Sequence, residues 1–310
     1  MVKLKQHDCG SLENLLDIAE DSKDWFNAQI RVFAAAAKGR VYHGGASTKR
    51  EKFEHEKKDA NGARVNVARS KMLSRSKAQR QLGTGGDFKK SLSDKVVPSA
   101  RAYQKAAEKG DYRFIKDVIR ASVVFPDCRS VIRALDLLKQ CSHFTPVEVK
   151  NNTESLKGAG YADINIIVVN PENGHLCELQ LHFEDMLAAK SGGGHKAYNV
   201  ERSALKGKSI GQVYAAQPHM ASATSFGGGW VQNKDYVNAK TARMSGRRVY
   251  GRAINNLMHS DPAGYRKMQT AIRSLAAVAA RNAVTFMASV QERDQKIAQG
   301  KIDPEFAAAL

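Results

Sequence analysis

The sequence lacks the usual signs of a membrane, secreted or zinc protein. Its four cysteines form no CxxC pair, and no Cys and His residues have the spacing of a zinc site. Cysteines within or beside apolar runs are typical of reduced, buried thiols in a cytosolic protein. No apolar segment approaches the ~20 residues that a bilayer span needs, and no apolar run follows residues 1–6. We therefore expect a soluble, cytoplasmic protein with neither a signal peptide nor a membrane partner.

Acidic residues are scarce relative to basic ones. The 310 residues include 49 Lys and Arg but only 31 Asp and Glu, which gives a net charge of +18. Such a balance favours anionic partners such as nucleotides, nucleic acid or an acidic surface, although solvated lysine faces explain it equally well. The glycine-rich stretch from Gly83 to Gly86 has neither the spacing of a P-loop nor a preceding strand, so phosphate binding would need another motif.

The N-terminal part is predicted to be helical and then basic. Ser11 can cap a short helix that ends at Glu20, and Ser22 or Asp24 can cap a second helix, Trp25 to Lys38. Residues 39–90 are dense in Lys and Arg and poor in aliphatic side chains. This stretch is either an exposed arm or a helix that needs a partner, and we expect the arm.

The middle of the chain alternates between helical and strand patterns. Helices are predicted at residues 97–109 and 129–140, and strands at residues 119–125, 147–150, 163–169 and 175–183. The turn that ends in Asn173-Gly174 should join the last two strands as a hairpin. In the last strand, Glu178, Gln180 and His182 alternate with apolar residues, so these three side chains share one face.

The C-terminal part contains one strong helical signal. Helix is expected at residues 183–190, with a break at residues 191–194 and a continuation to Leu205, and residues 206–250 are expected to be irregular. Asp261-Pro262 begins a helix of about 35 residues with a single apolar stripe. That stripe must lie on the core, on another helix or on a second copy of the chain, so an oligomer formed through this helix is an open alternative.

Four motifs occur together in the middle of the chain. They are Lys116-Asp117 with the following apolar strand, Gly160-Tyr161, Glu178-Leu-Gln180, and His195-Lys-Ala-Tyr198. In type, order and approximate spacing, the segment from about 95 to 205 resembles the nucleotidyltransferase domain of the RelA/SpoT family. These enzymes transfer pyrophosphate from ATP to the 3′-hydroxyl of a nucleotide. The resemblance covers about a third of the chain.

The resemblance implies a fold and a division of the chain. We expect an α/β (α+β) fold, with a mixed sheet of about five strands flanked by helices and helical extensions at both ends. Residues 91–206 would form the nucleotidyltransferase-like domain. Residues 1–90 would be a helical and basic extension, and residues 207–310 a loop-rich connection followed by the long helix.

The resemblance also implies a site. Asp117 and Glu178 would hold Mg²⁺, Glu178 would help to activate the attacking hydroxyl, and Gln180 would assist on the same face. Tyr161 would stack on the purine of the acceptor, although packing on the sheet is an equal alternative. Without the resemblance, Asp117 would be interpreted as a cap and Glu178 as an exposed strand residue.

Several cations are candidates for binding phosphates. Arg101 and Lys105 lie one helical turn apart, where the family binds the donor triphosphate, and Lys95 is a further candidate. Lys150 and Lys157 flank the segment that leads to Tyr161 and would meet acceptor phosphates. For any single one of these, a solvated face is the alternative. Arg120 and His182 complete the candidate nucleotide-binding set, whereas His195 and Tyr198 are expected to pack.

The sequence also departs from the family pattern. Arg120 and Ser122 replace the usual Gly and Arg, Asn165 replaces a His, and His182 replaces an Arg. Loss of arginines would weaken donor binding, unless Arg120 or the basic arm substitutes. The helical hydrolase domain of larger family members has no counterpart here, so hydrolysis of guanosine tetraphosphate is not expected.

Three functions therefore remain open. The first is ATP-dependent pyrophosphate transfer to a purine nucleotide, as in (p)ppGpp or (p)ppApp synthesis. The second is the same transfer to the 3′ end of an RNA such as tRNA, by a toxin-like enzyme. The third is a non-catalytic domain that binds nucleotide or RNA.

Overall fold

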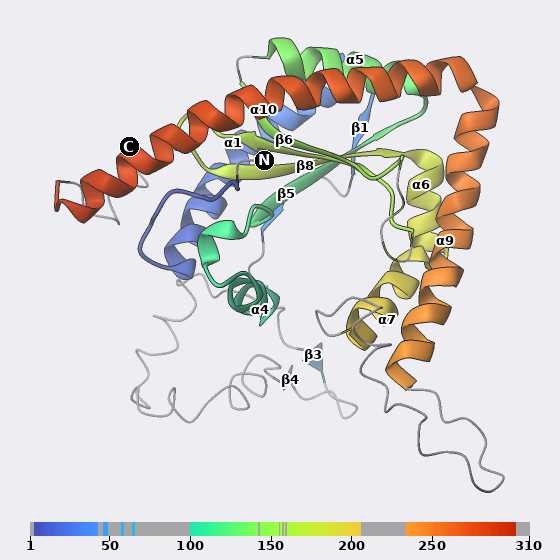
Figure 1. Ribbon diagram of the computed structural model, residues 1–310, viewed down its shortest axis with the longest axis horizontal. Coiled ribbons are helices and arrows are strands. Elements are labelled where there is room, and N and C mark those ends of the chain that lie inside the picture. The colour runs from blue at the N-terminus through green and yellow to red at the C-terminus, as the bar shows by residue number, and fades with distance from the viewer. Residues whose placement is uncertain are drawn as a thin grey trace, which may run out of the picture.

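A mixed sheet forms the centre of the protein, as the sequence predicts (Figure 1). The computed structural model describes residues 3–42, 46–48, 57–58, 64–65, 100–141, 143–154, 156, 158, 160–205 and 234–301. The strand order is β1-β5-β8-β7-β6, and β2 also pairs with β5, which makes six strands. A separate pair, β3 (Lys57–Lys58) and β4 (Arg64–Val65), is antiparallel.

The four long strands occur where alternating or continuous apolar patterns predict them. They are β5 (Ile119–Phe125), β6 (Thr145–Asn151), β7 (Ile164–Val169) and β8 (Leu176–Phe183). Strands β5 and β8 are parallel, whereas β7 is antiparallel to both β8 and β6. The predicted hairpin is confirmed, because Gly174 N donates to Asn170 O at 2.8 Å in the turn between β7 and β8.

The register of β5 and β8 separates polar from apolar side chains. Arg120 lies beside Glu178, and Ser122 lies beside Gln180. Because side chains alternate along a strand, these polar residues share one face and their apolar neighbours share the other. A slip of one residue would exchange the two faces, so burial of the apolar face fixes the polar one.

Three helices cover the apolar face. Residues from α1 (Leu12–Ala36), α5 (Cys128–Gln140) and the first half of α10 (Pro262–Ala298) join the strands in the main hydrophobic cluster. In Figure 1, α10 and α5 lie on one side of the sheet and α4 (Ala100–Lys109) lies on the other. Helices α6 (Glu184–Ala189), α7 (His195–Leu205) and α9 (Lys234–Ser260) gather at one end of the sheet. The polar face is thus bordered by α4 and by the α6–α7–α9 group.

The N-terminal helix differs from the prediction of two helices. Ser11 is the N-cap, as predicted, and its side chain accepts from Asn14 N. The predicted break after Glu20 is wrong, because α1 continues without interruption to Ala36. Ser22 is not a cap: it is buried inside the helix, and its Oγ accepts from Asn173 Nδ2 at 2.8 Å. A tertiary contact with the β7–β8 turn therefore uses the hydroxyl that suggested a helix start.

The expected arm and the expected irregular connection both contain regular structure. β1 (Arg40–Val41) and β2 (Ser47–Thr48) pair with β5, so the start of the basic stretch belongs to the sheet edge. Most of residues 49–99 lie outside the described residues. Residues 234–250, predicted to be irregular, form the first part of α9, while residues 206–233 lie outside the described part.

The long C-terminal helix is confirmed. Asp261 caps it by accepting from Gly264 N at 2.8 Å, and it runs for 37 residues. Its apolar stripe is buried against the sheet and α5: Met268, Ile272, Leu275, Ala279, Phe286 and Val290. Of the alternatives for this stripe, the core is the one that the structure shows.

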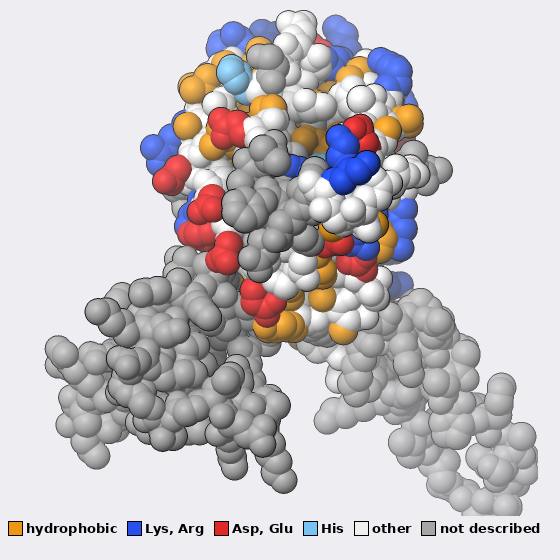
Figure 2. Space-filling view, turned by 90° about the vertical axis from the view of Figure 1, so that its left-hand side faces the viewer, with side chains coloured by type: hydrophobic (Ala, Val, Ile, Leu, Met, Phe, Trp, Pro, Cys, Tyr) orange, Lys and Arg blue, Asp and Glu red, His pale blue; other side chains and the backbone are white. Residues whose placement is uncertain are grey.

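The described surface carries no large apolar patch on the side shown in Figure 2, where acidic, basic and apolar side chains are interspersed. Among the described helices, none is long and apolar enough to cross a membrane. All four cysteines are free: Cys9, Cys128 and Cys177 are buried, whereas Cys141 is only partly buried.

Candidate active site on the polar face of the sheet

Glu178 lies at the end of a hydrogen-bonded row across β5 and β8. Its Oε1 accepts from Gln180 Nε2 at 2.7 Å, and Gln180 Oε1 accepts from Ser122 Oγ at 3.1 Å. Since an ionised carboxylate only accepts, the row orients the Gln180 amide with its NH₂ toward Glu178. Glu178 Oε2 has no hydrogen bond to a described residue. One carboxylate oxygen is therefore positioned by the protein, and the other faces a half-exposed surface.

Asp117 lies two residues before β5, at the end of the strand that also carries Arg120. Its side chain is 13% exposed and forms an ion pair with Lys105 of α4. Two residues that the sequence assigned to metal and phosphate binding are thus neighbours. Because Lys105 sits on the Asp117 carboxylate, a metal ion bound there would have to displace this ammonium group, which could then meet an anion.

A lysine cluster surrounds this end of the polar face. Lys116 and Lys150 both form ion pairs with Glu148 of β6. Burial, followed by the charges of Lys116 and Lys105, lowers the pKa of Lys109. Burial also lowers the pKa of Lys116, although Glu148 and, more weakly, the charge of Glu178 oppose this effect. Cations of α4, of the segment before β5 and of β6 therefore act on one another, and the charge of Glu178 reaches them.

Tyr161 lies in a cluster of rings at the other end of the polar face. Its ring meets the edges of His182 at 6.2 Å and Tyr250 at 6.0 Å, and is tilted against Tyr198 at 6.2 Å. Burial and the nearby carboxylate of Asp163 raise the pKa of the Tyr161 hydroxyl, so it is neutral. The ring is half-buried. Both expected roles, packing and an aromatic wall for a base, are compatible with this setting.

His182 cannot supply the charge of the arginine that it replaces. It is 2% exposed, and its Nε2 has no hydrogen-bond partner among the described residues. Burial, and then the charge of Lys190, lowers the pKa of His182 to about 3. It is therefore neutral near pH 7, and any contact with a nucleotide would be a polar contact rather than an ionic one.

The C-terminal helices hold the loop that leads to Tyr161. Arg247 of α9 donates from Nε to Gly158 O at 3.0 Å. Gln269 of α10 donates from Nε2 to Thr153 Oγ1 at 3.0 Å. Gly160 has φ +90°, and a Cβ at this position would lie 2.7 Å from Arg247 Cα. The glycine before Tyr161 thus allows α9 to approach the loop closely.

The structure places some of the remaining candidate site residues on the surface, and others lie outside the described residues. Lys157 and Lys95 lie outside the described residues, and Arg101 lies on α4 with a side chain that is not described. Lys150 is exposed and paired with Glu148. His195 and Tyr198 are exposed, and their rings stack at 6.3 Å.

Four side chains at the polar face were not among the residues predicted for the site. Lys190 and Tyr250 come from segments without a recognisable motif. Lys116 precedes β5 and Glu148 lies in β6, and the two pair although β8 and β7 lie between these strands in the sheet. Sequence spacing gives no signal for this pairing, because it depends on how the strands are ordered in the sheet.

The two predicted metal ligands, Asp117 and Glu178, do not belong to a preformed metal site among the described residues. No group of three or more His, Cys, Asp or Glu residues that could hold a metal ion occurs within the described part of the chain. Mg²⁺ commonly takes one or two protein carboxylates and completes its octahedral shell with water and substrate phosphates. Asp117 and Glu178 are carboxylates of this kind, and their role as Mg²⁺ ligands stays a prediction.

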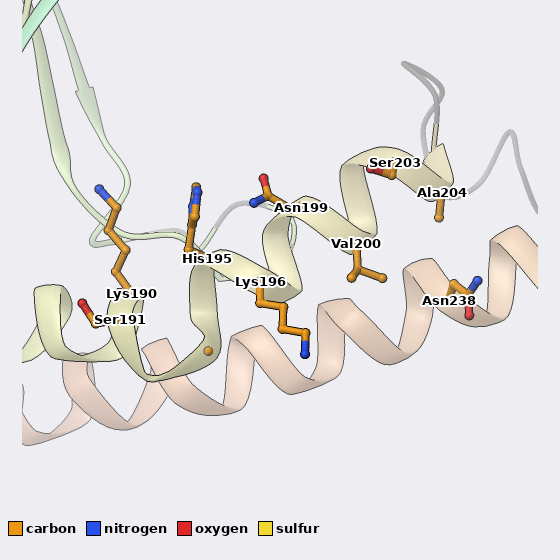
Figure 3. Close-up of a pocket in the computed structure, with 10 residues that line it drawn as sticks. Lys190, Ser191, His195, Lys196, Asn199, Val200, Ser203, Ala204 and Asn238 are labelled. Atoms are coloured by element: carbon orange, nitrogen blue, oxygen red, sulfur yellow. The ribbon is translucent and has the colours of Figure 1, made fainter. Parts of the chain in front are cut away.

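An open cavity of about 800 Å³ borders the ring cluster (Figure 3). Residues of the α6–α7 connection, of α7 and of α9 line it, including Lys190, His195, Lys196 and Asn238. Lys190 and His195 point away from α9, whereas Lys196 points toward it. Lys190 connects the cavity with the ring cluster, because its Nζ lies 5.9 Å from the ring centroid of Tyr161.

The chain has structural similarities to several known proteins. No family model and no curated protein matches the chain. It is similar in structure to small alarmone synthetase 1 from Bacillus subtilis bound to its product pppGpp, at 14% identity and a TM-score of 0.36, over 56% of this chain and 77% of that one. Small alarmone synthetase 2 from Bacillus subtilis gives 12% identity and a TM-score of 0.36, over 80% and 96% of the two chains. A GTP pyrophosphokinase family protein from Streptococcus pneumoniae gives 12% and 0.31, over 51% and 70%. Because all three TM-scores are below 0.5, these similarities carry no conclusion about activity, which has to be argued from the site.

Proposed function

We propose that this protein transfers pyrophosphate from ATP to the 3′-hydroxyl of a purine nucleotide. The observation that supports this most strongly is the row Ser122–Gln180–Glu178, which presents one oriented carboxylate on a sheet face beside a lysine cluster. Phosphoryl transfer requires little covalent chemistry from a protein. It depends on holding the reactants in line and on neutralising the phosphate oxygens.

Each residue has a distinct task in this proposal. Glu178 Oε2 accepts the proton of the attacking 3′-hydroxyl while Gln180 holds Oε1. Asp117 and Glu178 would hold Mg²⁺, which when bound neutralises the phosphate oxygens of ATP. Lys105 leaves Asp117 and binds a donor phosphate, and Tyr161 provides a wall for the base of the acceptor.

The proposal is tested by turnover with a panel of acceptors. Purified protein is incubated with ATP, Mg²⁺ and one of GDP, GTP, ADP or a second equivalent of ATP, and both AMP and the 3′-pyrophosphorylated product are measured. We expect AMP and product in equal amounts with at least one purine acceptor. Absence of AMP release with every acceptor would exclude a small-nucleotide acceptor.

A different acceptor is the first rival, and the net charge of +18 is the observation that favours it. A polyanion such as tRNA would be attracted at low ionic strength far more strongly than a mononucleotide. Adding labelled ATP and a mixture of tRNA and GDP tests this. Label on the RNA rather than on the nucleotide would show that pyrophosphate is transferred to an RNA 3′ end.

A domain that binds without turnover is the second rival. It is favoured by the neutral His182 at a position where the resemblance expects Arg, and by the Lys105–Asp117 ion pair. In that case ATP or RNA would bind wild-type protein and the Glu178→Gln variant with the same affinity, and neither would release AMP.

A further inference from the structure

Arg120 and Lys190 are two cations from distant segments that lie near each other on the polar face. Lys190 Nζ is 5.9 Å from the ring centroid of Tyr42, which follows β1, and β1 pairs with β5, the strand of Arg120. Arg120 belongs to β5, and Lys190 follows α6 at the connection to α7. We propose that they form a phosphate-binding pair that holds a phosphate group of a nucleotide substrate. The assignment to a nucleotide depends on the proposed function, whereas the binding of an anion between the two side chains does not.

Arg120 forms no ion pair with the carboxylate that lies beside it in the sheet. Its side chain is exposed, and Glu178 is its direct neighbour in the register of β5 and β8. Nevertheless, no ion pair joins these two residues, nor does Arg120 form one with any other described carboxylate. Its guanidinium group, with five donors in a planar fork, therefore remains available among the described residues for an anion.

Lys190 is held in place by aromatic rings. Its Nζ lies 5.9 Å from the ring centroids of both Tyr42 and Tyr161. The chain turns directly after it, because Gly192 and Gly193 leave helical geometry, and Gly193 has φ +113°. Figure 3 shows the Lys190 side chain pointing away from α9. This geometry directs the ammonium group toward the ring of Tyr161 rather than into the α6–α7–α9 group.

The two cations lie close enough to affect each other. Burial has the largest effect on the pKa of Lys190 and lowers it, and the charge of Arg120 lowers it further, against a smaller opposing effect of Asp163. Two like charges on a partly buried surface repel each other, and an anion between them would relieve that repulsion. Arrangements of this kind are typical of functional sites.

The position of the pair suits a substrate phosphate. Arg120 lies beside the candidate base Glu178, and Lys190 lies over the candidate base-stacking ring of Tyr161. Lys190 also lines the open cavity, so a ligand can reach it from solvent. The anion is a phosphate or pyrophosphate group, which either the donor triphosphate or the 5′-phosphates of the acceptor can supply.

The pair is tested by binding rather than by turnover. Inorganic pyrophosphate is titrated calorimetrically into full-length wild-type protein and into the variants Arg120→Gln, Lys190→Gln, Lys190→Arg and Lys196→Gln. Lys196 is the matched control, because it lines the same cavity with the same charge but points toward α9. The same titrations are repeated with GDP and with a non-hydrolysable ATP analogue to identify the source of the phosphate.

We expect Arg120→Gln and Lys190→Gln each to weaken pyrophosphate binding about 10-fold or more, as loss of a hydrogen bond to a charged group does. Lys190→Arg should retain binding, and Lys196→Gln should change it less than 2-fold. A matching loss with the ATP analogue or with GDP supports the pair and names the substrate. If Arg120→Gln and Lys190→Gln bind all three ligands as Lys196→Gln does, the pair is refuted. Because no turnover is measured, an inactive protein would contradict the proposed function and leave this result unaffected.

Discussion

Replacing Gly160 by alanine probes how the C-terminal helix α9 supports the candidate site. The new methyl group would lie 2.7 Å from Arg247 Cα and 3.0 Å from both Arg247 N and Gly246 O, all of them backbone atoms that cannot rotate away. The backbone of Gly160 also has φ +90°, which an alanine rarely adopts. Either the loop or α9 must therefore move.

The expected loss of folding stability in Gly160→Ala has two parts. Holding a non-glycine residue at a disfavoured positive φ costs about 1–3 kcal/mol. Forcing a methyl group into a filled space costs a further ~1–3 kcal/mol. Gly110 separates these parts, because it has φ +76° but nothing within 4 Å of an added Cβ. Gly160→Ala should therefore destabilise the protein by about 1–3 kcal/mol more than Gly110→Ala.

Urea unfolding of the two variants and the wild type measures this difference, and the midpoint is compared at constant slope. Since Tyr161 follows Gly160 directly, the KM for the acceptor should also rise in Gly160→Ala and remain unchanged in Gly110→Ala. Equal destabilisation by the two substitutions would show that α9 does not press on this loop, and the supporting role given to α9 would fail.

Three further predictions concern the interior. Gln180→Leu removes a hydrogen bond to the Glu178 carboxylate worth ~1.5–3 kcal/mol, so kcat for AMP release should fall about 10- to 100-fold; an unchanged kcat contradicts the positioning role. The Tyr250 hydroxyl is buried without a described hydrogen-bond partner, so Tyr250→Phe should leave the free energy of unfolding unchanged or raise it by up to ~1–3 kcal/mol, whereas a loss would reveal a partner. Burial, and then the charge of His7, lowers the pKa of His175 to about 3, so the folded state keeps it neutral while the unfolded state protonates it below pH 6.5. Stability should therefore fall as the pH falls from 6.5 to about 4, and His175→Phe should remove about 1.4 kcal/mol per pH unit of that slope in urea titrations; parallel slopes would refute this.

Local sequence patterns were sufficient to predict most of the long strands of the sheet. Strand β5 was predicted with its exact bounds because its β-branched run is followed directly by the cap of α5, where Asp127 accepts from Ser130 N. The alternation in β8 placed Glu178, Gln180 and His182 on one face, and the register confirms this arrangement.

Long-range packing overrode local signals elsewhere. Ser22 has the chemistry of a cap, but its hydroxyl bonds to the β7–β8 turn, which a sequence pattern does not reveal. Residues 234–250 contain Gly and Asn and show no strong period, yet they become helical because α7 and the loop before Tyr161 pack against them. Tertiary contacts decide the structure of such weakly biased segments.

The site was only partly predictable for the same reason. The resemblance pointed to Asp117, Glu178 and Tyr161, which come from separate parts of the chain. The ion pair between Lys105 and Asp117 depends on how α4 lies over the sheet, and the effect of the Arg120 charge on Lys190 depends on the position of the α6–α7 connection. No spacing in the sequence encodes those positions.

In the proposed reaction the Glu178 carboxylate accepts the proton of the attacking 3′-hydroxyl. A single-turnover comparison of wild-type protein with Glu178→Gln measures this contribution. With labelled ATP, Mg²⁺ and the best acceptor, we predict that the wild type forms the 3′-pyrophosphorylated product and that Glu178→Gln forms it about 10²–10⁴-fold more slowly, with an unchanged unfolding midpoint. Equal rates in the two proteins would contradict the role of Glu178 in pyrophosphate transfer.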